Sequence, residues 1–191
     1  MSLEHERKHF PWLILISFIL NFVASMASVF FPQYSYEQGF CWQLGSLFYI
    51  AGCCLVSVKL GSEKWHIASA GFIMLSIGQG ILFLLQTSVA DLTENGITNE
   101  VFREASAATL VLVPGYLFVC YYSGYPRWLR IMGVLSLVPF IAINVMLARD
   151  TYQFEEDMWI DGVGFGLQQI TGIGWGYYSL KPFKKINVQQ E

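Results

Sequence analysis

Residues 10–31, FPWLILISFILNFVASMASVFF, form an apolar stretch that contains no charged side chain. An α-helix needs about 20 apolar residues to cross the ~30 Å hydrocarbon core of a bilayer, so this stretch predicts a transmembrane helix. It lacks the alternation of apolar and polar residues that is typical of a transmembrane β-strand. Because only helices and closed barrels pair all their backbone groups inside lipid, the stretch predicts a helical membrane protein.

Five further apolar stretches of similar length follow, at about residues 42–60, 65–86, 105–123, 128–148 and 158–180. A soluble helical bundle would carry a charged face on each helix, whereas the first four stretches have almost no charge between their ends. The chain is 54% hydrophobic and 13% charged, compared with about 25% charged in soluble domains. We therefore predict an all-α membrane protein in which residues 1–191 form one domain, a bundle of six transmembrane helices.

Lysine and arginine residues are distributed unevenly between the two ends of the predicted helices. The N-terminal segment, the second and fourth loops and the C-terminal segment hold Arg7, Lys8, Lys59, Lys64, Arg127, Arg130, Lys181, Lys184 and Lys185. The opposite loops hold only Arg103 and Arg149. Because cytoplasmic loops carry an excess of basic residues, we predict a multi-pass protein whose N- and C-termini are both cytoplasmic.

The longest predicted loop, about residues 87–104, separates two groups of three helices. Three is an odd number, so the second group would run inverted relative to the first, as the halves of many transporters do. Gly78-Gln79-Gly80 in the third helix and Gly166-Leu167-Gln168-Gln169 in the sixth give a weak echo between the halves. Thr98 or Asn99 is a suitable N-cap residue, so residues 99–105 are predicted to extend the fourth helix outward.

Polar side chains inside the predicted helices are the best candidates for a functional site, because burying them in lipid is costly. They recur every three or four residues, and residues at this spacing share one helix face, which should point toward protein. In the predicted orientation most of them lie near the midplane or in the outer half of the bundle. The candidates for binding a ligand or lining a pore are Asn21, Gln43, Ser46, Gln79, Gln86, Asn144, Asp161 and Gln168.

Two interpretations fit these polar residues. One is a polar crevice that opens to the acidic, non-cytoplasmic side. The other is hydrogen bonding between helices, which is worth about 0.6 kcal/mol per contact on average. In both, Gln79 and Gln168 are predicted to face each other, a water molecule or a ligand, because lipid cannot satisfy an amide group.

The sixth predicted helix is unusually rich in glycine. Gly162 and Gly166 form one pair with four-residue spacing, and Gly172 and Gly176 form another. Small residues at this spacing allow a second helix to approach closely. The four glycines therefore predict helix packing, either inside the monomer or at the seam of a homo-oligomer, and a flexible gating helix is a third interpretation.

Residues with the potential for chemistry are few. Glu155, Asp157 and Asp161 are weak candidates for a hard-cation site, although the dipole of the following helix alone would stabilise acids there. The histidines lie near the predicted cytoplasmic face and the cysteines form no CxxC motif. We therefore predict no cofactor. A basic cluster with interleaved aromatic residues would indicate a nucleic-acid partner. The sequence contains no such cluster, so we predict no nucleic acid as a partner.

Two classes of function remain open at this point. The first is a non-enzymatic protein of a cell membrane: a small transporter, a channel or an accessory subunit. Its expected partners are membrane lipids and either further copies of the chain or another subunit of a membrane complex. The second is an embedded enzyme that uses acidic residues, with or without a metal, on a lipid or small molecule at the outer face. The sequence favours the first class, because it lacks a nucleophile with a partner base.

Overall fold

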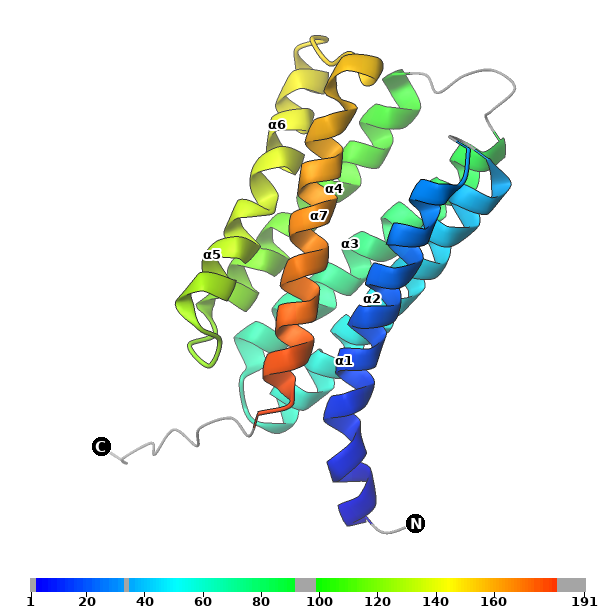
Figure 1. The fold of residues 1–191 in the computed structure, drawn as a ribbon. Coiled ribbons are helices and arrows are strands. Elements are labelled where there is room, and N and C mark those ends of the chain that lie inside the picture. The colour runs from blue at the N-terminus through cyan, green and yellow to red at the C-terminus, as the bar shows by residue number, and fades with distance from the viewer. Residues whose placement is uncertain (1–2, 33–34, 92–98, 182–191) are drawn as a thin grey trace.

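The computed structural model describes residues 3–32, 35–91 and 99–181, and within these ranges the chain is helical with no strand. Seven α-helices and one short 3-10 helix make up this part of the chain (Figure 1). They are α1 (Leu3–Ala27), η1 (Ser28–Phe30), α2 (Tyr36–Ser62), α3 (His66–Asp91), α4 (Asn99–Tyr121), α5 (Arg127–Leu135), α6 (Leu137–Ala148) and α7 (Phe154–Ser179). The predicted all-α class is confirmed, as is the helical extension predicted over residues 99–105.

Four helical spans are long and apolar enough to cross a membrane: His9–Phe30, Tyr36–Ser62, His66–Leu84 and Arg127–Ala148. A shorter apolar helix, Leu110–Tyr121, lies within α4. The described side chains agree with this composition, since many large apolar ones are exposed while thirteen polar ones among them are buried. The protein is therefore an integral membrane protein that passes the bilayer several times.

Helix ends are set by local hydrogen bonds. Ser35 caps α2, because its hydroxyl accepts a hydrogen bond from the Gln38 backbone N–H at 3.2 Å. The same helix ends at Ser62, and Lys64, just beyond the C-cap residue Glu63, is left-handed with φ 67°. The Trp65 N–H then bonds back to the Leu60 carbonyl at 2.9 Å, which is the Schellman arrangement. These bonds allow the very short connection between α2 and α3.

The fifth predicted helix, over 128–148, corresponds to the span Arg127–Ala148, which a turn at Ser136 divides into α5 and α6. Pro139 has no backbone N–H, so the carbonyl of Leu135 one turn earlier lacks its usual helical partner. Ser136 separates the two helices, and its hydroxyl donates to the Gly133 carbonyl at 2.7 Å. The break is therefore a proline effect, stabilised locally by a serine.

The helices form a closed ring in which each packs on the next and α7 returns to α1 (Figure 1). Trp175 of α7 is 1% exposed and lies at the centre of an aromatic cluster. Its ring centroid is 4.9 Å from that of Phe72, 5.7 Å from Tyr116 and 6.2 Å from Phe18. These contacts join α1, α3 and α4 to α7, so the core of the ring is aromatic at this level.

Candidate functional site

A second level of the ring is polar. Side chains from α1, α2, α3 and α7 meet there through amide and hydroxyl groups. We call this set the central polar layer, and its members are Asn21, Ser25, Ser46, Gln79, Gln168 and Gln169. The layer is the largest group of buried polar side chains in contact that the structure shows, and it is the candidate site.

One part of the layer joins α1 to α7 by a reciprocal pair of amides. Asn21 Nδ2 donates to Gln169 Oε1 at 2.5 Å, and Gln169 Nε2 donates to Asn21 Oδ1 at 3.3 Å. Gln169 Nε2 also donates to Ser25 Oγ at 3.0 Å. Because both amides are buried, each satisfies groups on the other that lipid would leave unpaired.

The other part of the layer joins α7, α3 and α2. Gln168 Nε2 donates to Gln79 Oε1 at 3.2 Å, and Gln79 Nε2 donates to Ser46 Oγ at 3.0 Å. This contact confirms that the two glutamines face each other. The remaining acceptor, Gln168 Oε1, is buried and has no hydrogen-bond partner among the residues that the structure describes.

The two parts adjoin through Gly45, the residue before Ser46. A Cβ atom at Gly45 would lie 2.9 Å from Ser25 Oγ and 3.4 Å from Asn21 Oδ1. The missing side chain therefore lets α2 approach α1 at the level of the layer. Next to it, the Tyr49 hydroxyl lies 3.3 Å from the Tyr116 hydroxyl.

The chemistry available in the layer is hydrogen bonding without charge. Its six side chains are amides and hydroxyls, none of which titrates near neutral pH. They cannot serve as a general base, and the two serines contact amides rather than an activating base. The layer is suited to holding a neutral polar molecule or water, and equally to fixing helices against one another.

The structure places the remaining predicted residues apart from these contacts or does not describe them. Gln43 is half-buried on α2, and Asn144 on α6 donates to the Phe140 carbonyl of its own helix at 2.8 Å. The side chains of Gln86 and Asp161 lie outside the described part. Of the eight predicted pore-lining residues, Asn21, Ser46, Gln79 and Gln168 meet in the central polar layer.

The four predicted packing glycines of α7 divide into two pairs. A Cβ atom at Gly176 would lie 2.9 Å from the Leu15 Cα, and one at Gly172 would lie 2.9 Å from Phe18 Cδ1. No described atom lies within 4 Å of a Cβ position at Gly162 or Gly166. Close approach to α1 is therefore seen at the second pair and not at the first.

The acidic segment at the start of α7 has a structural contact. Asp157 Oδ2 accepts a hydrogen bond from the Gln153 backbone N–H at 2.9 Å. The side chains of Glu155 and Asp161 are outside the described part. Across the described residues no three His, Cys, Asp or Glu side chains are grouped closely enough to hold a metal ion.

Two members of the layer, Gln169 and Ser25, were not among the predicted ligand-binding residues. Ser25 lies four residues after Asn21 and so shares its helix face, which is a signal that the sequence contains. Gln169 follows Gln168 directly, and consecutive residues face different neighbours. The sequence cannot show that α1 and α3 lie on either side of this pair.

No protein-family model, curated protein or solved structure matches the chain. A function therefore has to be inferred from the chain's own contacts.

Proposed function

We propose that the chain is a six-pass, non-enzymatic membrane protein of the transporter, channel or accessory-subunit kind, whose central polar layer receives a small uncharged polar molecule or water from the non-cytoplasmic side. The observation that carries the proposal is the buried Gln168 Oε1, an acceptor without a protein partner in the described structure. Such an atom costs about 1–3 kcal/mol if it remains unpaired, which favours a polar guest beside it.

The outward faces of α4 and α7 support the fifth and sixth crossings. The exposed large apolar residues of α7 are Trp159, Val163, Ile170 and Tyr177, which share one helix face. Gly172, Gly174 and Gly176, which lower the hydropathy of α7 together with Gln168 and Gln169, lie against protein as the two glutamines do. An apolar outer face is what a helix needs where it contacts lipid. In α4 the exposed Leu110, Leu117 and Phe118 supply one as well.

The arrangement of charges supports cytoplasmic termini. The start of α1 and the end of α7 lie at the same end of the ring (Figure 1). The α2–α3 and α4–α5 connections lie at that end too. Lys59, Lys64, Arg127, Arg130 and Lys181 lie in or beside these elements, while Arg149 ends α6 at the other end. The positive-inside rule then assigns this end to the cytoplasm.

The ring order is compatible with two inverted halves. If α1–α3 correspond to α4–α7, with α5 and α6 counted as one broken helix, each contact in the first half has a counterpart in the second. The α3–α4 contact then corresponds to the contact of α7 with α1. The hydrogen bond between Gln79 and Gln168 lies between the two equivalent third helices, where inverted-repeat transporters place their sites.

A neutral guest is favoured over a charged one. An ion at membrane depth needs an opposite charge or several oxygens directed at it. The layer instead offers amide and hydroxyl groups that are largely bonded to one another. Gly162 lies seven residues before Gln169 and so on the same side of α7, and no described atom lies within 4 Å of its Cβ position, which supports access from the outer end. For the enzyme alternative the described structure offers Asp157, whose carboxylate already bonds the helix start.

Cysteine accessibility tests the proposal. In a variant whose four native cysteines are replaced by alanine, Ser46→Cys should react with a membrane-impermeant methanethiosulfonate reagent added outside sealed cells. Ser57→Cys is the matched control, because Ser57 is also a buried serine of α2, in the cytoplasmic half, where it bonds Ser69 at 3.0 Å. We expect labelling at position 46 and none at position 57. Equal protection of both positions, in variants with wild-type thermal stability, contradicts an outward-open layer.

A further inference from the structure

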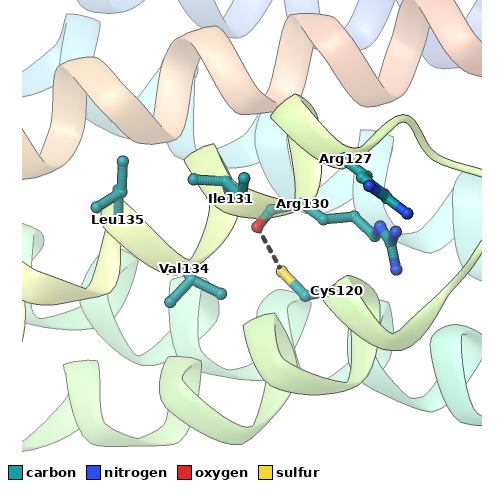
Figure 2. Close-up of a pocket in the computed structure, with 6 residues that line it drawn as sticks. All are labelled: Cys120, Arg127, Arg130, Ile131, Val134 and Leu135. Carbon is teal, nitrogen blue, oxygen red and sulfur yellow. Dashed lines mark hydrogen bonds between the residues drawn. The ribbon is translucent and has the colours of Figure 1, made fainter.

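A groove runs along α5 on the outer surface of the ring, at the end that carries the basic residues. It has a volume of about 450 Å³. Its lining comes from α4 through Cys120 and from α5 through Arg127, Arg130, Ile131, Val134 and Leu135 (Figure 2). It is separate from the central polar layer, with which it shares no residue.

The lining is ordered by polarity along the groove. The two guanidinium groups lie next to each other at the end near Cys120, and Ile131, Val134 and Leu135 extend away from them (Figure 2). From Arg127 to Leu135 the helix rises about 12 Å at ~1.5 Å per residue. The groove thus combines a cationic end with an apolar trough. This is complementary to a phospholipid, which has an anionic phosphate and apolar acyl chains.

The positive charge of the groove is not neutralised by its own helices. From Arg127 to Ala148, α5 and α6 contain no acidic residue. Arg130 Nε is buried and has no hydrogen-bond partner within the described ranges. The Cys120 thiol donates to the Arg130 carbonyl at 3.1 Å, which holds the backbone of this arginine against α4. The backbone of Arg130 is therefore held in place while its side chain lines the groove beside Arg127.

The depth of the cationic end suits a lipid headgroup. Trp128 lies between the two arginines in sequence and is half exposed, as expected for an indole at a membrane interface. Its ring centroid is 6.2 Å from that of Tyr178, near the end of α7. Because α5 begins at Arg127, its N-terminal dipole adds to the attraction for a phosphate at this level.

We propose that this groove binds an anionic phospholipid of the cytoplasmic leaflet, with its phosphate between Arg127 and Arg130 and an acyl chain along Ile131, Val134 and Leu135. Arginine binds phosphate through two parallel N–H groups, and basic pockets between helices on the cytoplasmic side recognise acidic headgroups in this way. The apolar trough favours a lipid over free phosphate, because free phosphate has no apolar group that could fill it.

Native mass spectrometry of the full-length protein tests this site without any variant. The protein is exchanged into micelles that hold phosphatidylglycerol and phosphatidylcholine in equal amounts. We expect preferential retention of phosphatidylglycerol, whereas equal retention of the two lipids overturns the proposal. In a second arm, inorganic phosphate is added. Loss of bound lipid at physiological phosphate concentration would assign the cationic end to free phosphate instead.

Variants then place the lipid in the groove. Changing both arginines to glutamine should reduce the preference for phosphatidylglycerol about 30-fold, the equivalent of ~1 kcal/mol per arginine near an anionic surface. Arg127→Gln and Arg130→Gln alone should each reduce it about fivefold, and Arg149→Gln, at the opposite end of the ring, is their charge-matched control and should leave the preference unchanged. Val134→Trp should reduce retention by filling the trough with no change in charge. Unaltered retention in Val134→Trp would show that the lipid binds elsewhere.

Discussion

Two glycine pairs on α7 have the same four-residue spacing and opposite surroundings. Gly172 and Gly176 lie against α1, with the Leu15 backbone within 2.9 Å of a Cβ position at Gly176. Gly162 and Gly166 have no described neighbour within 4 Å. The spacing therefore indicates that a helix could approach, while the presence of one depends on where the ring closes. Gly172 and Gly176 build the bundle, and no described side chain covers Gly162 and Gly166.

The largest expected effect is that of Gly176→Leu. The new side chain would meet the α1 backbone, which cannot rotate aside as a side chain can. Overpacking of this kind costs typically 1–3 kcal/mol, and here we expect about 3 kcal/mol, at the upper end. Thermal unfolding in detergent checks this, with Gly166→Leu as the matched control of equal size. Similar melting temperatures for the two variants would contradict the difference between the pairs.

The next effect concerns the contact that continues the α1–α7 seam outward from Gly172. Gln169→Leu leaves the Asn21 amide buried without its reciprocal partner, at a cost of about 1–3 kcal/mol. The double variant Asn21→Leu with Gln169→Leu removes both amides and should recover much of the loss. A double-mutant cycle on the free energies of unfolding measures the coupling between Asn21 and Gln169. Additive losses would show that the two amides do not stabilise each other.

A smaller effect is expected at the other amide pair. Gln168→Leu removes one hydrogen bond to Gln79 and also the unpartnered Oε1, so the two consequences oppose each other. We expect a stability change of about 0.6 kcal/mol or less. In the Ser46→Cys background the same change should reduce labelling, because a leucine makes the layer less polar. A large loss of stability with unchanged labelling would identify Gln168 as a purely structural residue.

No loss of stability is expected at the open pair. Gly166→Ala adds one methyl group in unfilled space and lowers the conformational freedom of the unfolded chain. We expect unchanged or slightly higher stability, by about 0.5–1 kcal/mol, the usual helix preference for alanine over glycine. Thermal unfolding beside Gly172→Ala, which would meet Phe18, measures the contrast. Destabilisation at position 166 would reveal a partner, such as a second copy of the chain, on this face.

Hydropathy predicts where the chain meets lipid better than it predicts where helices begin or break. α1 begins at Leu3 and α2 at Tyr36, ahead of the apolar stretches, because backbone hydrogen bonds continue into the polar segments. The interruption at Ser136 depends on how Pro139 is accommodated, which an apolar run does not show. Hydropathy is least informative for α7. Much of the surface of this helix faces protein rather than lipid, so its residues there can be polar or small.

The sequence predicts which residues of the candidate site face inward, but not which helix each of them meets. The spacing of Asn21, Ser46, Gln79 and Gln168 indicates faces that turn inward, and the contact between Gln79 and Gln168 follows from their depth. Gln169 could not be assigned a partner, because only the closure of the ring brings α1 to that side of α7. Asn144 has the same residue type as Asn21, yet it bonds its own helix.

An experimental density map of the full-length protein in lipid nanodiscs, at a resolution that shows ordered water, tests the account most directly. We expect density from a water molecule or small polar molecule within hydrogen-bonding distance of Gln168 Oε1, beside the contact to Gln79. A map in which that oxygen bonds only to protein, with side chains filling the space from Gly162 to Gln169, would contradict an accessible layer and leave its amides a purely structural role.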